Sequence, residues 1–292
     1  MNPELRGRLS PFRDKAIAEG IPAEDVERWL ATARPCATLT QDEGEDGDGD
    51  GPVVGRFGGP LLLPADTPDP FHPFVASIDL AALPADATDL PLPPDGHLLL
   101  FAFVEDEGDF TPTGSGSVVY VPAGTAVEER DRLSWAWSDE DEYQETVEKF
   151  PQGPLRATVD VSLPYHSLVS LSEKPWVATL PGHPHSQELT DVWESTQDDI
   201  ATSGPLQIGG YASHEAVDVD PVAIAVSDAL AAAEAGRRDG AVSGDVSDWV
   251  LLADWHAWVE GWEGATVHWV IQREDLAARR FDRAFTSVFW NP

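Results

Sequence analysis

Basic residues and cysteine are scarce in this sequence. The 292 residues include 18 Lys and Arg against 52 Asp and Glu, which gives a formal net charge of −34 at pH 7. Such a field repels nucleic acid and anionic membranes, because phosphate binding requires clustered Lys and Arg. We therefore expect no nucleic-acid partner and no membrane partner. A basic protein partner would fit the charge, but general solubility, or the acidic proteome of a salt-adapted organism, explains it more simply.

Cys36 is the only cysteine, which excludes an intrachain disulfide and a zinc site built from cysteines. Its neighbours predict a small buried strand residue rather than a nucleophile. The N-terminal residues lack the apolar core of a signal peptide, and no stretch approaches the roughly 20 apolar residues of a membrane helix. We therefore expect a cytoplasmic protein.

Motifs of common chemistries are missing as well. The sequence has no nucleophile elbow of a serine hydrolase, no phosphate-binding loop, no dinucleotide fingerprint and no His-Glu-x-x-His motif. Catalysis is therefore unsupported, although it is not excluded, and we expect no cofactor.

The chain does contain ample material for a folded core, with 42% hydrophobic residues and 11 Trp. Apolar residues at helical spacing predict helices, and short apolar or alternating runs predict strands. The expected helices are 22–33, 186–200, 221–235 and 275–285, and the expected strands are 37–39, 114–121, 155–163, 249–253 and 266–271. The acidic residues 139–148 are expected to form a solvated face or loop.

Three short patterns occur twice in the same order: a Gly-Gly turn, an apolar strand reaching an Asp, and a tight turn followed by an apolar strand. The pairs are 57–60 with 208–211, 73–80 with 248–255, and 95–103 with 263–271. Because the connecting lengths differ, the pattern indicates a duplicated architecture rather than a tandem repeat. We predict an α+β fold in which two β-rich halves, about 53–165 and 205–292, form a mainly antiparallel sheet core with peripheral helices. In this plan a helical segment (1–34) precedes a single domain (35–292).

Several segments together resemble the YwqG-like family of bacterial proteins of unknown function. They are 33–35, 57–60 with 63–64, 74–84, 92–96, 207–211 and 267–281. The resemblance covers the chain from about Arg34 onward and implies an α+β fold with a duplicated β core, but no agreed activity. Some members are encoded beside secreted toxins, which implies an immunity or interaction role. The family favours Gln before Ile-Asp, where this chain has Ser77, and the corresponding residue of the second half is Ala253.

His183 and His185 are the best local candidates for a metal site. Two imidazoles two residues apart in a loop can reach one ion, and Glu188 or Asp191 would add a carboxylate. The fragment lacks a third fixed ligand, so a surface loop explains it more simply.

A second metal candidate is the acidic run containing Asp46, Asp48 and Asp50, which matches the first half of a calcium loop. However, the twelfth position is Phe57 rather than Glu, and Pro52 interrupts the pattern. A flexible acidic linker is the simpler interpretation.

Aromatic residues gather near the C-terminal end. Trp255, Trp258 and Trp262 lie beside the acidic residues Glu260 and Glu263, a combination that would anchor a basic partner. Core packing explains most such tryptophans, so we expect one rim of the cluster, rather than all of it, to be exposed.

Asp79 and Asp254 occupy equivalent places in the two repeated patterns. Two carboxylates facing each other would support acid–base chemistry if their environments separated their pKa values. Capping of the following turn by each carboxylate is the simpler interpretation.

The sequence therefore favours a non-catalytic protein that binds a protein partner. The alternative is a small-ligand or metal-dependent enzyme with its site between the two halves. Polar side chains converging in a deep cleft between the halves would favour the enzyme, and an exposed apolar or acidic face without such a cleft would favour the binding protein.

Overall fold

A computed structural model describes residues 3–41, 51–104, 111–130, 141–167, 180, 182–215 and 217–290. Asp46, Asp48 and Asp50 of the predicted calcium-like loop lie outside the described residues. The helices are α1 (Pro3–Arg8), α2 (Ser10–Ala18), α3 (Ala23–Leu30), α4 (Asp141–Glu148), α5 (Ser186–Glu194), α6 (Gln197–Ile200), α7 (Pro221–Glu234) and α8 (Arg273–Ala277), with short turns η1 (Val246–Asp248) and η2 (Phe281–Arg283). The strands are β1 (Arg34–Gln41), β2 (Val53–Phe57), β3 (Leu61–Pro64), β4 (Phe74–Asp79), β5 (His97–Ala102), β6 (Gly116–Val121), β7 (Val127–Arg130), β8 (Gly153–Ser162), β9 (Leu206–Gly209), β10 (Trp249–His256), β11 (Ala265–Gln272) and β12 (Phe285–Trp290).

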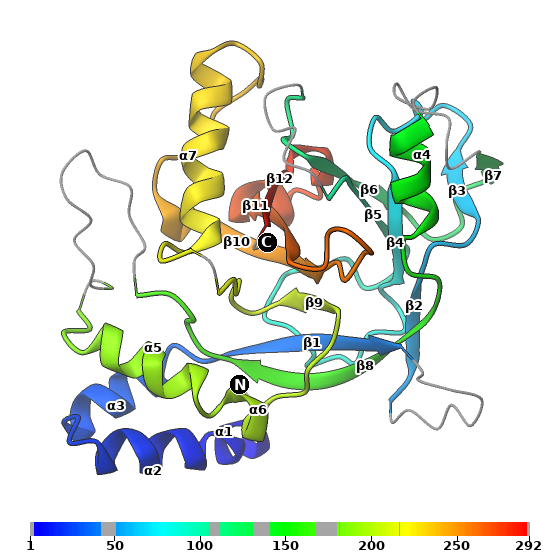
Figure 1. Cartoon of the computed structure of the whole chain (residues 1–292). Coiled ribbons are helices and arrows are strands. Elements are labelled where there is room, and N and C mark those ends of the chain that lie inside the picture. Colours follow the sequence, from blue (N-terminus) through cyan, green and yellow to red (C-terminus); the bar gives the residue numbers. More distant parts are fainter. Residues whose placement is uncertain are drawn as a thin grey trace.

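Within the described residues, ten strands form one sheet in the order β12-β11-β10-β9-β1-β8-β2-β4-β5-β6. Every neighbouring pair is antiparallel. The central pair, β1 and β8, is joined from Arg34 opposite Ser162 to Gln41 opposite Leu155. Figure 1 shows these two strands side by side along the lower part of the sheet, with the two arms of the sheet rising from them.

The two ends of the sheet meet and nearly close a barrel. The Thr286 N–H of β12 donates to the Thr113 carbonyl at 2.8 Å, and the Ser115 N–H donates to the Thr286 carbonyl at 3.0 Å. Gly114 permits this approach, because a Cβ on it would collide with the Thr286 carbonyl and its φ is +77°. The near-closed sheet confirms the predicted α+β class and mainly antiparallel sheet.

The largest core cluster fills the inside of this near-barrel. Strands from both arms contribute to it, including Phe57 from β2 and Trp255 from β10, whose rings are 6.2 Å apart. The Trp269 indole N–H donates to the Phe101 carbonyl at 3.1 Å, which joins β11 to β5 across the interior. Both tryptophans have 0% exposure. The Trp269 bond is worth about 1 kcal/mol, whereas the Trp255 indole N–H has no hydrogen-bond partner among the described residues.

Helices and a small second sheet cover the outside of the near-barrel (Figure 1). Helices α2 and α3 pack with α5, α6 and the end of β8, where the Phe12 and Trp193 rings meet edge to face at 6.3 Å. Helix α7 packs on the β10–β12 arm, and the two-stranded β3–β7 sheet packs on the β4–β6 arm. In the part of the chain that the structure describes, no helix is both long enough and apolar enough to cross a bilayer.

The structure corrects three expected elements. Residues 141–148 form helix α4 rather than a loop, and its apolar residue Val147 is buried. The helix expected over 186–200 breaks, because the Ser195 and Thr196 hydroxyls donate to the Val192 carbonyl at 2.9 and 2.8 Å and compete with the backbone. The closing helix ends at Ala277, and Phe285–Trp290 pairs with β11 instead.

Candidate functional site

A row of polar side chains crosses the outer face of the β9–β12 arm. Directly paired positions of neighbouring strands place Thr38, Gln207, Asp254, His268 and Ser287 in sequence across β1, β9, β10, β11 and β12. Paired residues of antiparallel strands present their side chains on the same face, so these five groups lie next to one another. A stretch of ordinary apolar strands therefore carries a continuous polar stripe under its covering segments.

A β-bulge decides which residues of β10 face this stripe. The register with β11 shifts between Leu251 and Ala253, and such a bulge adds one residue to one strand. Side chains alternate between the two faces of a strand, so the extra residue moves each side chain after the bulge to the opposite face. Trp255 turns into the core, and Asp254 and His256 turn outward.

Asp254 is the centre of the stripe and is 1% exposed, and His268 is 0% exposed. The Oδ1 atom of Asp254 lies 3.3 Å from Nδ1 of His268 and 4.0 Å from Nε2 of His256. Its Oδ2 atom accepts a hydrogen bond from the Ser213 N–H at 3.2 Å. Burial raises the pKa of Asp254, but the two histidines and this N–H outweigh burial and hold the pKa below its usual value. The carboxylate therefore remains ionised at neutral pH.

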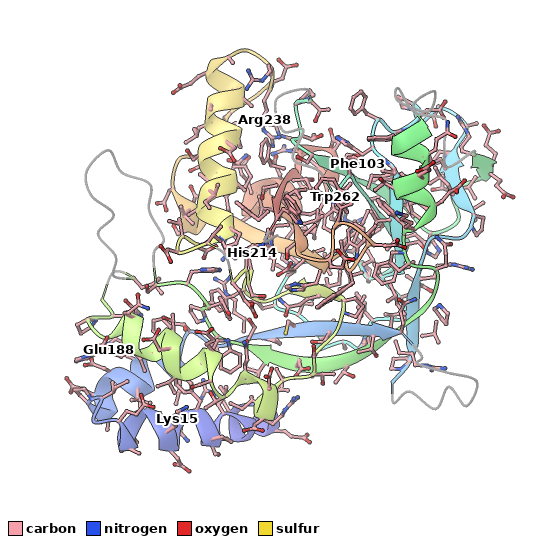
Figure 2. All side chains as sticks on the ribbon, viewed as in Figure 1. Lys15, Phe103, Glu188, His214, Arg238 and Trp262 are labelled. Carbon is pink, nitrogen blue, oxygen red and sulfur yellow. The ribbon has the colours of Figure 1, made fainter. Side chains whose placement is uncertain are left out.

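Two more histidines cover the pair. His166 and His214 are 5% and 4% exposed, and the His214 ring lies 6.4 Å from the His268 ring and 5.6 Å from Phe289. Figure 2 shows His214 near the lower end of helix α7 and strand β10. Burial, followed by the neighbouring histidines, lowers the pKa of both His166 and His214 to about 4. Both imidazoles are therefore neutral at pH 7.

The stripe borders a cavity of about 120 Å³ that is lined by Asp254, His256, Gln207 and Ser213, among others. An open groove of about 1060 Å³ shares Ser213, His256 and Tyr165 with this cavity, so the cavity forms the inner end of the groove. The residues come from the strands β1, β8, β9 and β10 and from helices α5 and α6. Polar groups thus converge at one cavity, an arrangement that the sequence analysis associated with the small-ligand enzyme rather than with the binding protein.

Trp258 lies on the rim of the groove. Its side chain is 72% exposed, and its φ of +46° places the backbone in the left-handed region. A bulky residue rarely adopts this conformation, which costs on the order of 1–3 kcal/mol and is concentrated at functional sites. Among the described residues, Arg279 is the only other non-glycine residue with a positive φ.

The other members of the predicted aromatic cluster are placed differently. Trp255 is 0% exposed and belongs to the core, so its ring offers no surface to a partner in this structure. Trp262 is half-buried and packs against Trp290 with the rings tilted and their centroids 5.2 Å apart. Glu260 and Glu263 are exposed, and the Glu263 carboxylate accepts the Gly261 N–H at 3.1 Å within the loop. The expected single exposed rim is therefore represented chiefly by Trp258.

The predicted metal ligands His183 and His185 lie at the start of α5, next to α3. His183 packs edge to face on Trp29 with ring centroids 5.3 Å apart. His185 lies 3.5 Å from Asp25 and 3.4 Å from Glu188. Figure 2 shows Glu188 on this side of the molecule, away from His214.

No third ligand completes this predicted metal site. Asp191 accepts from the Gln187 amide at 3.0 Å instead. No group of three His, Cys, Asp or Glu side chains in the described part of the chain is arranged to hold a metal ion.

Sequence reasoning missed the histidines His166, His214 and His268. The one signal available was the spacing of Asp254 and His256, which places both side chains on the same face of a strand. Their position next to His268 depends on the bulge. The positions of His166 and His214 depend on the segments that follow β8 and β9. None of these relations is local in the sequence.

Cys36 lines the cavity but is buried, and burial followed by the charge of Asp160 raises the pKa of its thiol well above its usual value. The thiol is therefore protonated and unreactive, as expected for a small buried strand residue.

No curated protein matches the chain. Residues 55–288 match a family described as a domain of unknown function, DUF1963, and the chain belongs to that family.

Proposed function

We propose that this chain is a binding protein whose groove receives a segment of a protein partner. The single observation that carries the proposal is Trp258, a mostly exposed tryptophan held in a strained backbone at the rim of the groove. Exposed aromatic anchors supply much of the energy of protein binding. Selection for stability alone would not retain the strained backbone of Trp258. Contact between the ligand and the Trp258 ring would account for it.

The charges around the groove indicate a basic partner. Asp198 and Glu215 line the groove and Asp254 lines its inner cavity, whereas Lys149 is the only Lys or Arg among the described lining residues. The net charge of −34 extends this field over the whole molecule. Complementary charge would accelerate association, and the tryptophan would slow dissociation.

Capture from the native lysate tests the proposal. Equal amounts of the immobilised wild-type chain and of its Trp258→Ala and Trp290→Ala variants would be compared. Trp290 is a matched control, because it is a 49% exposed tryptophan that does not line the groove. We expect Trp258→Ala to retain at least about tenfold less of the partner, as for an interface anchor, and Trp290→Ala to retain it.

Equal retention by the wild type and Trp258→Ala would contradict the groove as the binding site. Loss with Trp290→Ala alone would move the interface to the Trp262–Trp290 pair and its neighbours Glu260 and Glu263. Recovery of a secreted toxin by the wild type would support the immunity role that the family resemblance implies.

A small-ligand enzyme is the second candidate, favoured by the ionised Asp254 beside His256 at the cavity wall. A carboxylate that orients an imidazole is a common acid–base arrangement. Incubation of a metabolite extract with the wild type and with His256→Gln, followed by mass spectrometry, tests this candidate. A compound consumed only by the wild type would support it, and identical profiles would argue against it.

We also propose that the two arms of the sheet arose by duplication, within the YwqG-like part of the family. Read outward from the centre, β8-β2-β4-β5-β6 and β1-β9-β10-β11-β12 follow the same sequence of elements. The Gly58-Gly59 and Gly209-Gly210 turns correspond, and all four glycines have positive φ. We expect the two arms to superpose more closely in that strand order than in any shifted order.

A further inference from the structure

The inner cavity holds a buried carboxylate with unused hydrogen-bonding capacity. Asp254 is 99% removed from solvent, and its Oδ1 atom has no hydrogen-bond partner among the described residues. The 3.3 Å contact from Oδ1 to Nδ1 of His268 lacks hydrogen-bond geometry. The other oxygen, Oδ2, accepts the Ser213 N–H. A buried ionised carboxylate with so few donors is costly, so a cationic group in the cavity that Asp254 lines is favoured.

We infer that this cavity receives a positively charged alkylammonium or guanidinium end, which donates to Asp254. The inference rests on the proposed binding function of the groove and names the chemistry of the group that enters it. A Lys or Arg side chain of a partner segment and a free polyamine both present this chemistry. The open groove would hold the rest of the ligand.

The charges that face the carboxylate agree with a cationic ligand. No Lys or Arg is among the described residues that line the cavity. His166 and His214, which cover the pair from the adjoining segments, are neutral at pH 7. His256 and His268 also face Asp254.

The remaining walls suit an ammonium group. Tyr165, Trp193 and Tyr211 supply aromatic rings, and hydroxyl and amide oxygens lie between them. Aromatic rings attract cations by their quadrupoles and form the cages that bind alkylammonium groups. Tyr211 already has the Arg34 guanidinium 4.5 Å from its ring centroid, which shows the attraction next to the cavity. Arg34 itself does not line the cavity.

The cavity size is consistent with the end of a side chain. One water needs roughly 10–15 Å³ of such volume, so about 120 Å³ holds several groups of that size. This space fits a cationic head and part of its stem, and it excludes a whole folded element. The groove continues this space through Ser213 and His256.

Titration of the wild-type chain with simple probes tests the inference by amide NMR. The probes are n-butylammonium, n-butylguanidinium and uncharged n-butanol at matched ionic strength. We expect saturable shifts of the Ser213 and His256 amides with the two cations and at least tenfold weaker effects with n-butanol. Equal effects of n-butanol and n-butylammonium, or no saturable shift with either cation, would overturn the inference.

Variants and longer probes sharpen the result. Asp254→Asn keeps the shape and should abolish the preference for cations, and retention of that preference in a folded variant would also overturn the inference. If Asp254→Asn fails to fold, the comparison of charged and uncharged probes on the wild type still decides. A lysine-containing hexapeptide and spermidine distinguish the two sources of the cation. Tighter binding of the hexapeptide would indicate a partner segment, and tighter binding of spermidine would indicate a polyamine.

This result is separable from the proposed function. Trp258→Ala should weaken the hexapeptide at least as strongly as it weakens capture of the partner, while n-butylammonium still shifts Ser213. Cation binding with no effect of Trp258→Ala on the partner would leave the cavity inference standing and reject the groove as the interface.

Discussion

Asp79 and Asp254 lie on β4 and β10, each the third strand outward from the centre of the sheet, and each lies opposite a histidine in the next strand. Asp79 pairs with His97 across β4 and β5, and Asp254 pairs with His268 across β10 and β11. Asp79 ends its strand, and its carboxylate accepts the Ala81 N–H at 3.0 Å. Asp254 lies within its strand and is 1% exposed. The same pair of residue types therefore serves a turn in one arm and a buried site in the other.

The difference lies in what covers each arm. Beyond Asp79 the chain turns at once, and His97 is exposed at the start of β5. Beyond Asp254 the strand continues to His256, and the segments carrying His166 and His214 lie over the pair. Water screens the first pair and is excluded from the second, so Coulombic effects are much stronger in the second. Two local patterns that look alike thus differ by their surroundings.

The largest expected effect compares the two carboxylates directly. Asp254→Ala should lower the free energy of unfolding by about 3 kcal/mol, because it leaves the Ser213 N–H without its acceptor and removes the buried carboxylate that lies 3.3 Å from His268. Asp79→Ala should cost about 1 kcal/mol, the usual value of a single turn hydrogen bond. Urea unfolding followed by tryptophan fluorescence measures both. Equal losses would show that burial does not distinguish the two arms.

The histidines over Asp254 give a pH dependence of intermediate size. The pKa of His166 and His214 is about 4 in the folded chain against an ordinary 6.5. Between pH 6.5 and 4 the unfolded chain therefore binds more protons, and stability falls as pH falls, by about 1.4 kcal/mol per pH unit for each proton. His72, with a pKa also near 4, adds a contribution of the same sign.

Asp220 opposes this trend and supplies a control of opposite sign. Burial raises its pKa from 3.8 to about 6, so its contribution to stability is lost as pH rises through that range. His214→Gln should flatten the pH dependence of the urea midpoint by about one proton, and Asp220→Asn should steepen it by about one. Both variants changing the slope in the same direction would contradict the assigned surroundings of the cluster.

The smallest expected effect concerns the loops that follow the two strands. The loop between β4 and β5 and the loop between β10 and β11 are both fully described. Of these two loops, only the second contains a non-glycine residue with positive φ, which is Trp258. Trp258→Gly removes this strain, so we expect a stability between unchanged and about 1 kcal/mol higher. Arg279→Gly, at φ +58°, is the matched control outside the groove.

Thermal unfolding and partner capture should separate these two glycine variants. Both should keep or slightly raise the melting temperature, but only Trp258→Gly should lose the partner. A clear loss of stability with Trp258→Gly would mean that the ring packs as a structural residue, and the comparison between the loops would then fail.

The sequence predicted the elements that depend on local patterns. Helix 221–235 appears as α7, ending one residue earlier, because its apolar residues recur at helical spacing and Asp220 caps its first turn. The strand expected over 155–163 appears as β8 for the same local reason. Strand β12 was missed, since its place is defined by pairing with β11 and by Thr286 reaching Thr113 and Ser115.

The candidate site shows the same division more sharply. The sequence by itself determined a strongly acidic chain with one unreactive cysteine, a rich supply of tryptophan and a Trp-containing stretch after a strand. Only the tertiary structure decided that Trp255 is buried, that Trp258 lies at a groove, and that Asp254 faces His268 rather than the core. The physical reason is the bulge between Leu251 and Ala253, because one extra residue in a strand reverses the face of every residue after it.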